Sequence, residues 1–171
     1  GYRVVAINSE GETTSAFATG FTGAAAPADL AAPSVKALDG DKVQVDWKAP
    51  TTPNGALVKY QVLVRIKGKN YVTEAYSDTD EATTAVITQS IRPAVTFEVS
   101  VVFTNSVGKV QSDWVEVTTP ESLPDNFPSD QPVVTSKSYD SIEVAWNCSQ
   151  FLNGKLTKTT ITRYDHGARS K

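Results

Sequence analysis

The chain repeats itself at a spacing that equals the length of one small domain. The segment Val43–Trp47 recurs as Ile142–Trp146, and the two tryptophans lie 146 − 47 = 99 positions apart. The segment Asn8–Gly11 recurs as Asn105–Gly108, at an offset of 105 − 8 = 97 positions. A period of this length is typical of arrays of small folded units. We therefore expect the end of one unit, a complete unit and the start of a third.

These offsets divide the chain into five parts. Residues 1–19 hold the last strands of a partial unit, 33–119 a complete unit, and 132–171 the first strands of another partial unit. Two linkers join them: 20–32 is rich in alanine and glycine, and 120–131 is rich in proline. We expect the second linker to be the stiffer one, because proline fixes φ and favours extended backbone.

Alternating apolar and polar residues predict β-strands in each unit. Val43, Val45 and Trp47 alternate with polar residues, and the same period of two follows Phe97. Turns rich in Gly, Pro, Asn and Asp separate these runs, so the pattern predicts an all-β, antiparallel two-sheet sandwich. The seven strands expected in the complete unit lie near residues 33–38, 42–48, 57–67, 70–77, 82–88, 94–104 and 109–118.

Taken together, these residues resemble the fibronectin type III family. The family's spacing is matched by Pro33, Val43-x-Val45-x-Trp47, Pro50, Asn54-Gly55, Leu57, Tyr60-x-Val62, Ile91-x-Pro93, Phe97-x-Val99-x-Val101-x-Phe103 and Asn105-x-x-Gly108. The resemblance implies tandem immunoglobulin-like, seven-stranded antiparallel sandwiches, one complete and two partial. It also implies that Trp47, Trp146, Tyr60 and Phe97 mark hydrophobic cores. Phe97 stands where the family usually has a tyrosine whose hydroxyl bonds to nearby backbone.

The two partial units leave two interpretations open. A lone hairpin is marginal in water, and neither residues 1–19 nor residues 121–171 can bury both faces of a sandwich alone. One interpretation is a segment of a longer protein whose missing strands lie outside it. The other is strand addition between copies, in which one chain completes the next. The two fragments together would still lack the strands equivalent to 70–88, which counts against the second interpretation.

The sequence offers little for catalysis, so we expect no enzyme activity from this segment. His166 is the only histidine and Cys148 the only cysteine, and both lie in a partial unit. A Ser-His-Asp or Cys-His arrangement would have to be built on these two residues alone. No Cys/His cluster has zinc spacing, and no glycine-rich phosphate loop is followed by lysine, so no cofactor is expected.

Charge and hydropathy exclude two further classes of partner. The net charge is −3 and the basic clusters are small, whereas nucleic-acid binding needs a concentrated basic face. No apolar run approaches the ~20 residues that span a bilayer, so we expect no direct membrane contact from this segment. The acidic residues Asp78, Asp80 and Glu81 match no calcium-loop spacing and are expected to form a turn. Protein partners, either neighbouring domains or another chain, remain.

The candidate binding and modification residues lie in loops and on the last strand. Asn147 begins an Asn-Cys-Ser sequon and is a possible glycosylation site. Loops at one end of a sandwich can vary while the core holds, so Asn54, Asn105 and Lys109 are candidate partner-binding residues. As turn residues, the two asparagines are expected to tolerate substitution better than Trp47. Trp114 either packs on the linker or sandwich edge, or forms an aromatic hot spot for a partner.

These observations favour a non-catalytic spacer and protein-interaction module, in adhesion or recognition, within a cell-surface or extracellular multidomain protein. The sequon favours that location. One alternative is an intracellular scaffold array of the muscle or ciliary kind, which would suit an unpaired cysteine. The other is the ectodomain of a receptor phosphatase or kinase whose enzyme domain lies outside the segment.

Overall fold

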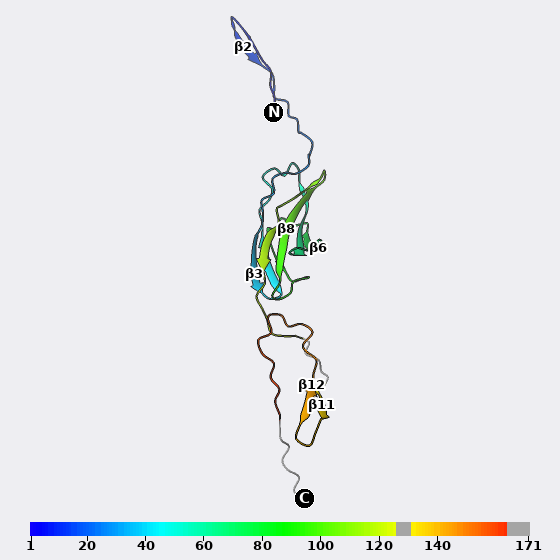
Figure 1. The fold of residues 1–171 in the computed structure, drawn as a ribbon. Helices are drawn as coiled ribbons and strands as arrows, with labels where there is room; N and C mark the ends of the chain where they lie inside the picture. The colour runs from blue at the N-terminus through cyan, green and yellow to red at the C-terminus, as the bar shows by residue number, and fades with distance from the viewer. Residues whose placement is uncertain (126–130, 164–171) are drawn as a thin grey trace.

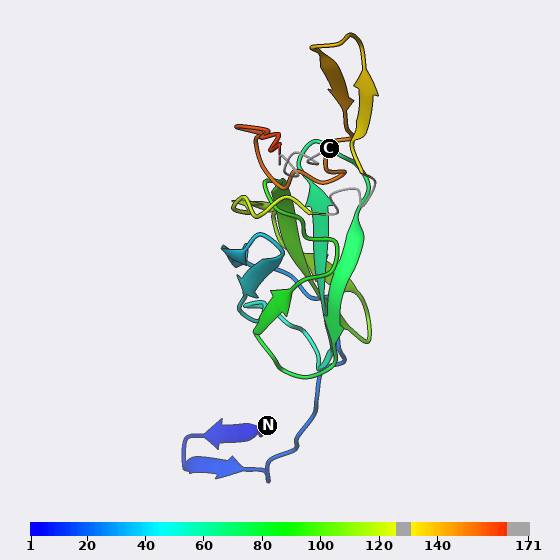
Figure 2. The ribbon, with the colours of Figure 1, turned by 90° about the horizontal axis from the view of Figure 1, so that it is seen from below.

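The computed structural model describes residues 1–125 and 131–163, which form a sandwich with a short hairpin on either side (Figure 1). The first hairpin pairs β1 (Val5–Asn8) with β2 (Gly11–Thr14). The last pairs β11 (Val133–Ser136) with β12 (Ile142–Ala145). Both hairpins stand apart from the sandwich in two perpendicular views (Figures 1 and 2).

Two antiparallel sheets face each other in the sandwich. The smaller sheet has the order β3-β4-β7, and the larger has the order β10-β8-β5-β6, with β9 also paired to β8. The strands are β3 (Ser34–Asp39), β4 (Lys42–Asp46), β5 (Leu57–Ile66), β6 (Thr73–Asp78), β7 (Thr84–Ile87), β8 (Thr96–Asn105), β9 (Lys109–Gln111) and β10 (Val115–Thr118). The all-β prediction is confirmed, and the strands lie within a few residues of their expected positions.

The last expected strand, 109–118, is divided in two at Ser112. The Ser112 N–H donates to the Val101 carbonyl (2.9 Å), but the Val101 N–H donates to the Ser112 hydroxyl (3.0 Å) rather than to a backbone carbonyl. The Ser112 carbonyl instead accepts from the Ser100 hydroxyl (2.9 Å). A side chain thus replaces one backbone acceptor. This replacement interrupts the pairing with β8 at the point that separates β9 from β10.

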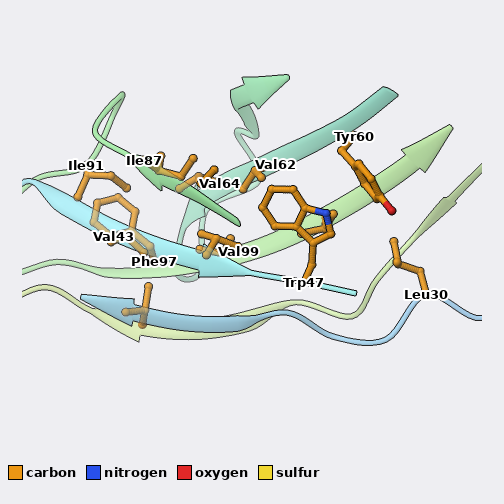
Figure 3. Close-up of a cluster of buried hydrophobic side chains, with 14 of the residues drawn as sticks. Leu30, Val43, Trp47, Tyr60, Val62, Val64, Ile87, Ile91, Phe97 and Val99 are labelled. Atoms are coloured by element: carbon orange, nitrogen blue, oxygen red, sulfur yellow. The ribbon is translucent and has the colours of Figure 1, made fainter. Parts of the chain in front are cut away.

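Apolar residues that alternate along the strands fill the space between the sheets, as Figure 3 shows. Trp47, Tyr60 and Phe97 are buried in this core at 5%, 3% and 1% exposure. The expectation that Trp146, at the position equivalent to Trp47, marks a core stays a prediction, since its side chain is 41% exposed here. The reason is that, within the described part of the chain, β11 and β12 pair only with each other and no second sheet covers them.

The sandwich begins earlier than the sequence boundary of residue 33. Leu30 is 8% exposed and belongs to the core cluster, although it lies in the expected linker 20–32. Ala28 forms a bridge with Thr52, and the Ala25 N–H donates to the Asn54 carbonyl at 2.9 Å. The linker that precedes the sandwich therefore ends near residue 24.

Phe97→Tyr is expected to stabilise the sandwich. Phe97 lines a surface hollow together with Ser90 and Arg92, at the position where the family usually has a tyrosine whose hydroxyl bonds to nearby backbone. Restoring a hydrogen bond to that backbone is worth about 1 kcal/mol. For a domain of this size, thermal unfolding followed by circular dichroism should show a rise in Tm of about 4–8 °C. A lower Tm than that of the wild type would contradict this assignment of the corner.

Candidate functional site

Asn105 joins three segments of the chain at one end of the sandwich. Its side-chain nitrogen donates to the Ala25 carbonyl (2.7 Å) and to the Pro53 carbonyl (2.9 Å). Its side-chain oxygen accepts from the N–H groups of Val107 and Gly108, both at 2.9 Å. Asn105 is 4% exposed and all its amide hydrogen-bonding groups are used, so it cannot serve as the partner-binding residue that the sequence suggested.

Asn54, in the loop before β5, binds the same linker segment that contacts Asn105. It has a positive φ of 50°, which asparagine tolerates better than most residues. Its carbonyl accepts from the Ala25 N–H, and its side-chain nitrogen donates to the Ala26 carbonyl at 2.8 Å. Asn54 is exposed, but its amide nitrogen fastens the linker to the loop before β5.

The same contacts recur where the third unit begins. Asn153 has a φ of 52°, and its carbonyl accepts from the Ser122 N–H at 2.9 Å. Its side-chain nitrogen donates to the Leu123 carbonyl (2.9 Å), and the Asp125 N–H donates to the Phe151 carbonyl (2.9 Å). We call each set of contacts around Asn54 and Asn153 an asparagine clasp. The loop residues correspond at an offset of 153 − 54 = 99, and the linker residues at 122 − 25 = 97.

The turn at Asn105 also has a counterpart in the first hairpin. The Asn8 side-chain oxygen accepts from the N–H groups of Glu10 (2.9 Å) and Gly11 (3.1 Å). These are the positions that match Val107 and Gly108 at the offset of 97. Both repeats found in the sequence therefore correspond to repeated hydrogen bonds in the structure.

Trp114 packs against the outer face of the larger sheet. The Arg65 guanidinium carbon lies 4.2 Å from the centre of the indole ring, and Arg65 Nε forms an ion pair with Glu98 Oε2 at 2.7 Å. Arg65 and Glu98 are directly opposite one another on β5 and β8. Trp114 is half-buried, and its contact with Arg65 is a cation–π interaction. Sequence reasoning missed Arg65 and Glu98, although their place in alternating strands could have suggested a cross-strand pair.

A second ion pair lies next to Trp114 on the same sheet. Lys67 Nζ is 2.8 Å from Glu116 Oε2, and both side chains are about half exposed. The hydrogen bond from Lys67 to Glu116 raises the pKa of the lysine. Lys109, at the start of β9, is exposed and lies farther along the same sheet. The structure thus places Lys109 on β9, which pairs with β8, and Trp114 just before β10 rather than on a strand, whereas Asn105 and Asn54 lie at the end of the sandwich.

The remaining candidate residues lie in the third unit or in a turn. Asn147 and Cys148 are exposed, and the Ser149 hydroxyl donates to the carbonyls of Asp125 and Phe151. His166 lies outside the described residues. Asp78 accepts from the Tyr76 hydroxyl (2.7 Å) and from the Asp80 N–H (3.0 Å).

These contacts give the acidic turn a structural explanation. The Asp80 N–H and then the Tyr76 hydroxyl lower the pKa of the Asp78 carboxyl, because both bonds favour its charged form. No group of three or more His, Cys, Asp or Glu side chains in residues 1–125 and 131–163 could hold a metal ion. Nor do these residues include a helix that is long and apolar enough to cross a membrane.

Two facing antiparallel sheets with this strand order define an immunoglobulin-like β-sandwich. The family model of the fibronectin type III domain matches residues 25–118, and the chain belongs to this family.

Several relatives and solved structures are similar to the chain. Usherin of Mus musculus is 34% identical over 129 residues, which cover 72% of this chain and 2% of Usherin. The phosphatidylinositol phosphatase PTPRQ of Homo sapiens is 30% identical over 128 residues, covering 72% of this chain and 5% of that protein. The chain therefore spans only a small part of these curated relatives.

The solved structures show the fold alone. Domains A168–A170 of titin share 16% identity with the chain at a TM-score of 0.52, covering 64% of this chain and 36% of theirs. A fourth FNIII domain from a human protein shares 20% identity at a TM-score of 0.51, covering 62% of this chain and 89% of its own.

Proposed function

We propose that the chain is a non-catalytic spacer and protein-interaction module from a tandem fibronectin type III array, in a cell-surface or extracellular multidomain protein with an adhesion or recognition role. The observation that carries this proposal is the recurrence of the asparagine clasp at Asn54 and Asn153. Each clasp fastens an incoming linker to the loop that follows the second strand of its unit. Repetition of a joining contact is what a string of similar units requires.

The similarity to Usherin and to a phosphatidylinositol phosphatase supports a place in a much longer chain, because the matched stretch is 2% and 5% of their lengths. A spacer needs length and a defined path, whereas a binding module needs particular surface residues. Trp114 and Lys109 are the surface residues that we assign to the binding part of this role.

A replacement experiment in the parent protein separates the two parts of the proposal. Deleting residues 25–118 is expected to abolish the adhesion or recognition activity of the parent protein. If the sandwich acts only as a spacer, an unrelated fibronectin type III sandwich of the same length should restore that activity fully. If binding also matters, the replacement should restore function only partly, and Trp114→Ala in the native sandwich should cause a similar partial loss. A deletion without effect would contradict both parts.

Asn147 is expected to carry an N-linked glycan when the protein is made by secretory cells. The residue is exposed in the loop after β12, so the glycan would meet no packed surface. Endoglycosidase treatment should lower the mass of the secreted protein, and Asn147→Gln should remove that change. The same mass before and after treatment would remove the support for an extracellular location and favour the intracellular scaffold.

A second candidate function is the ectodomain of a receptor phosphatase. The 30% identity to a phosphatidylinositol phosphatase over 128 residues favours it. In that case the enzyme domain lies outside this segment, and the role of these residues within the larger protein is unchanged. Detection of phosphatase activity in the parent protein, retained after deletion of residues 25–118, would support this candidate.

A further inference from the structure

We propose that one end of the middle sandwich, formed by the Asp39–Asp41 turn and the Arg92–Pro93 segment, is a docking surface for the Phe151–Asn153 loop of the following unit. Docking there fixes the orientation of the following unit, whereas residues 19–23 act as a hinge before the sandwich. This inference deepens the proposed spacer function and rests on it for its biological meaning.

Residues 119–122, which leave the sandwich toward the third unit, are hydrogen-bonded on both sides. The Thr119 hydroxyl donates to the Arg92 carbonyl (2.6 Å), and the Ala94 N–H donates to the Pro120 carbonyl (3.1 Å). The next residue, Glu121, already accepts from the Lys155 N–H of the third unit at 3.1 Å. Ser122 then joins the Asn153 clasp. Consecutive residues are thus hydrogen-bonded to opposite partners, Glu121 through its side-chain oxygen.

Side chains reinforce this junction. The Arg92 guanidinium carbon lies 5.8 Å from the centre of the Phe151 ring. A hollow of about 460 Å³ between the two parts is lined by residues from both, including Gly40, Pro93, Phe151 and Asn153. The turn at Gly40 lies so close to Pro93 that a Cβ on it would be 3.0 Å from the proline Cγ and 3.3 Å from the Pro120 carbonyl. Gly40 therefore lets the turn reach the start of the linker.

The junction before the sandwich contains a stretch without such hydrogen bonds among the described residues. Its last anchored residue on the hairpin side is Ala18, which exchanges backbone hydrogen bonds with Tyr2 at 2.7 and 2.8 Å. The next contacts with the sandwich are Ala24, which packs on Gly55, and Ala25, in the Asn54 clasp. Residues 19–23 form no hydrogen bond within the described chain, and Phe21 among them is 99% exposed. The second junction is thus stiffened by hydrogen bonds in addition to its prolines.

Distances between pairs of spin labels test both halves of the proposal in the 171-residue chain. The only cysteine, Cys148, is exposed and serves as the label site on the third unit. Val86→Cys adds a second label on β7, where the side chain is 54% exposed. For the first junction, Thr13→Cys on β2 and Val86→Cys are combined with Cys148→Ser. We expect a narrow distance distribution across the second junction and a several-fold broader one across the first.

One double variant and one matched control link the result to the contacts. Arg92→Ala together with Asn153→Ala should broaden the distribution between positions 86 and 148. Asn54→Ala, at the equivalent position of the other clasp, should leave that distance unchanged. Circular dichroism melting confirms that the sandwich is folded in each variant. Equal widths at the two junctions of a folded protein would overturn the inference. That outcome would leave the replacement experiment, and with it the spacer function, unaffected.

Discussion

Trp47→Ala is expected to destabilise the middle sandwich by about 3–5 kcal/mol, the usual cost of deleting a buried tryptophan. The indole lies between the two sheets (Figure 3). The ring centres of Tyr60 and Tyr76 are 5.6 and 6.2 Å from that of Trp47. Small domains have a total stability of about 5–15 kcal/mol, so the substitution removes most of the stability of a domain at the low end. Urea unfolding followed by circular dichroism measures the change.

Two further variants make this result specific. Trp146→Ala changes the equivalent residue of the third unit, where the side chain is 41% exposed, and should leave the urea midpoint of the sandwich unchanged. Trp47→Phe keeps a ring in the core and removes a buried Nε1–H that meets no acceptor among the described residues. It should cost clearly less than Trp47→Ala, because no hydrogen bond is lost with that group. A Trp47→Ala protein that unfolds at the wild-type midpoint would show that Trp47 lies outside the core.

Asn105→Ala is the second large effect that we expect, at about 2–3 kcal/mol. The substitution leaves the carbonyls of Ala25 and Pro53 without their shared donor. It also leaves the N–H groups of Val107 and Gly108 without their acceptor. Asn105→Ala is still expected to cost less than Trp47→Ala, but the burial of Asn105 makes its cost larger than that of an exposed turn residue.

Asn54→Ala and Asn105→Asp provide the comparison for this effect. Asn54 is exposed, so water can replace the hydrogen bond that its side chain makes, and its loss should cost about 0.5–1.5 kcal/mol. Asn105→Asp keeps the acceptor for Val107 and Gly108, but its second carboxylate oxygen would face two carbonyls in place of a donor. At neutral pH it should therefore lower the free energy of unfolding by at least as much as Asn105→Ala. Equal urea midpoints for Asn54→Ala and Asn105→Ala would mean that the buried contacts of Asn105 contribute nothing.

Much of the sandwich was predictable because its signal is local. The alternation around Val43, Val45 and Trp47 placed three inward-facing side chains on one strand, and the structure buries all three. The division of the last strand at Ser112 was not predictable, because it depends on a hydroxyl that replaces a backbone acceptor on the neighbouring strand. The site was less predictable than the fold. Trp114 was singled out from its position, but Arg65, which its ring contacts, and Glu98, which pairs with Arg65, come from β5 and β8.

The sequence by itself revealed the two repeats and predicted from them where the units lie. The offsets of 97 and 99 positions reflect residue types that a small β-sandwich needs at fixed places, and residue types are directly visible in a sequence. Only the tertiary structure decided how the units are joined. Asn105 reaches carbonyls that are 80 and 52 residues away, and each clasp uses backbone groups of its linker. Backbone groups are the same in every residue, so the sequence shows the repeated asparagines but not the linker N–H and carbonyl groups that they meet.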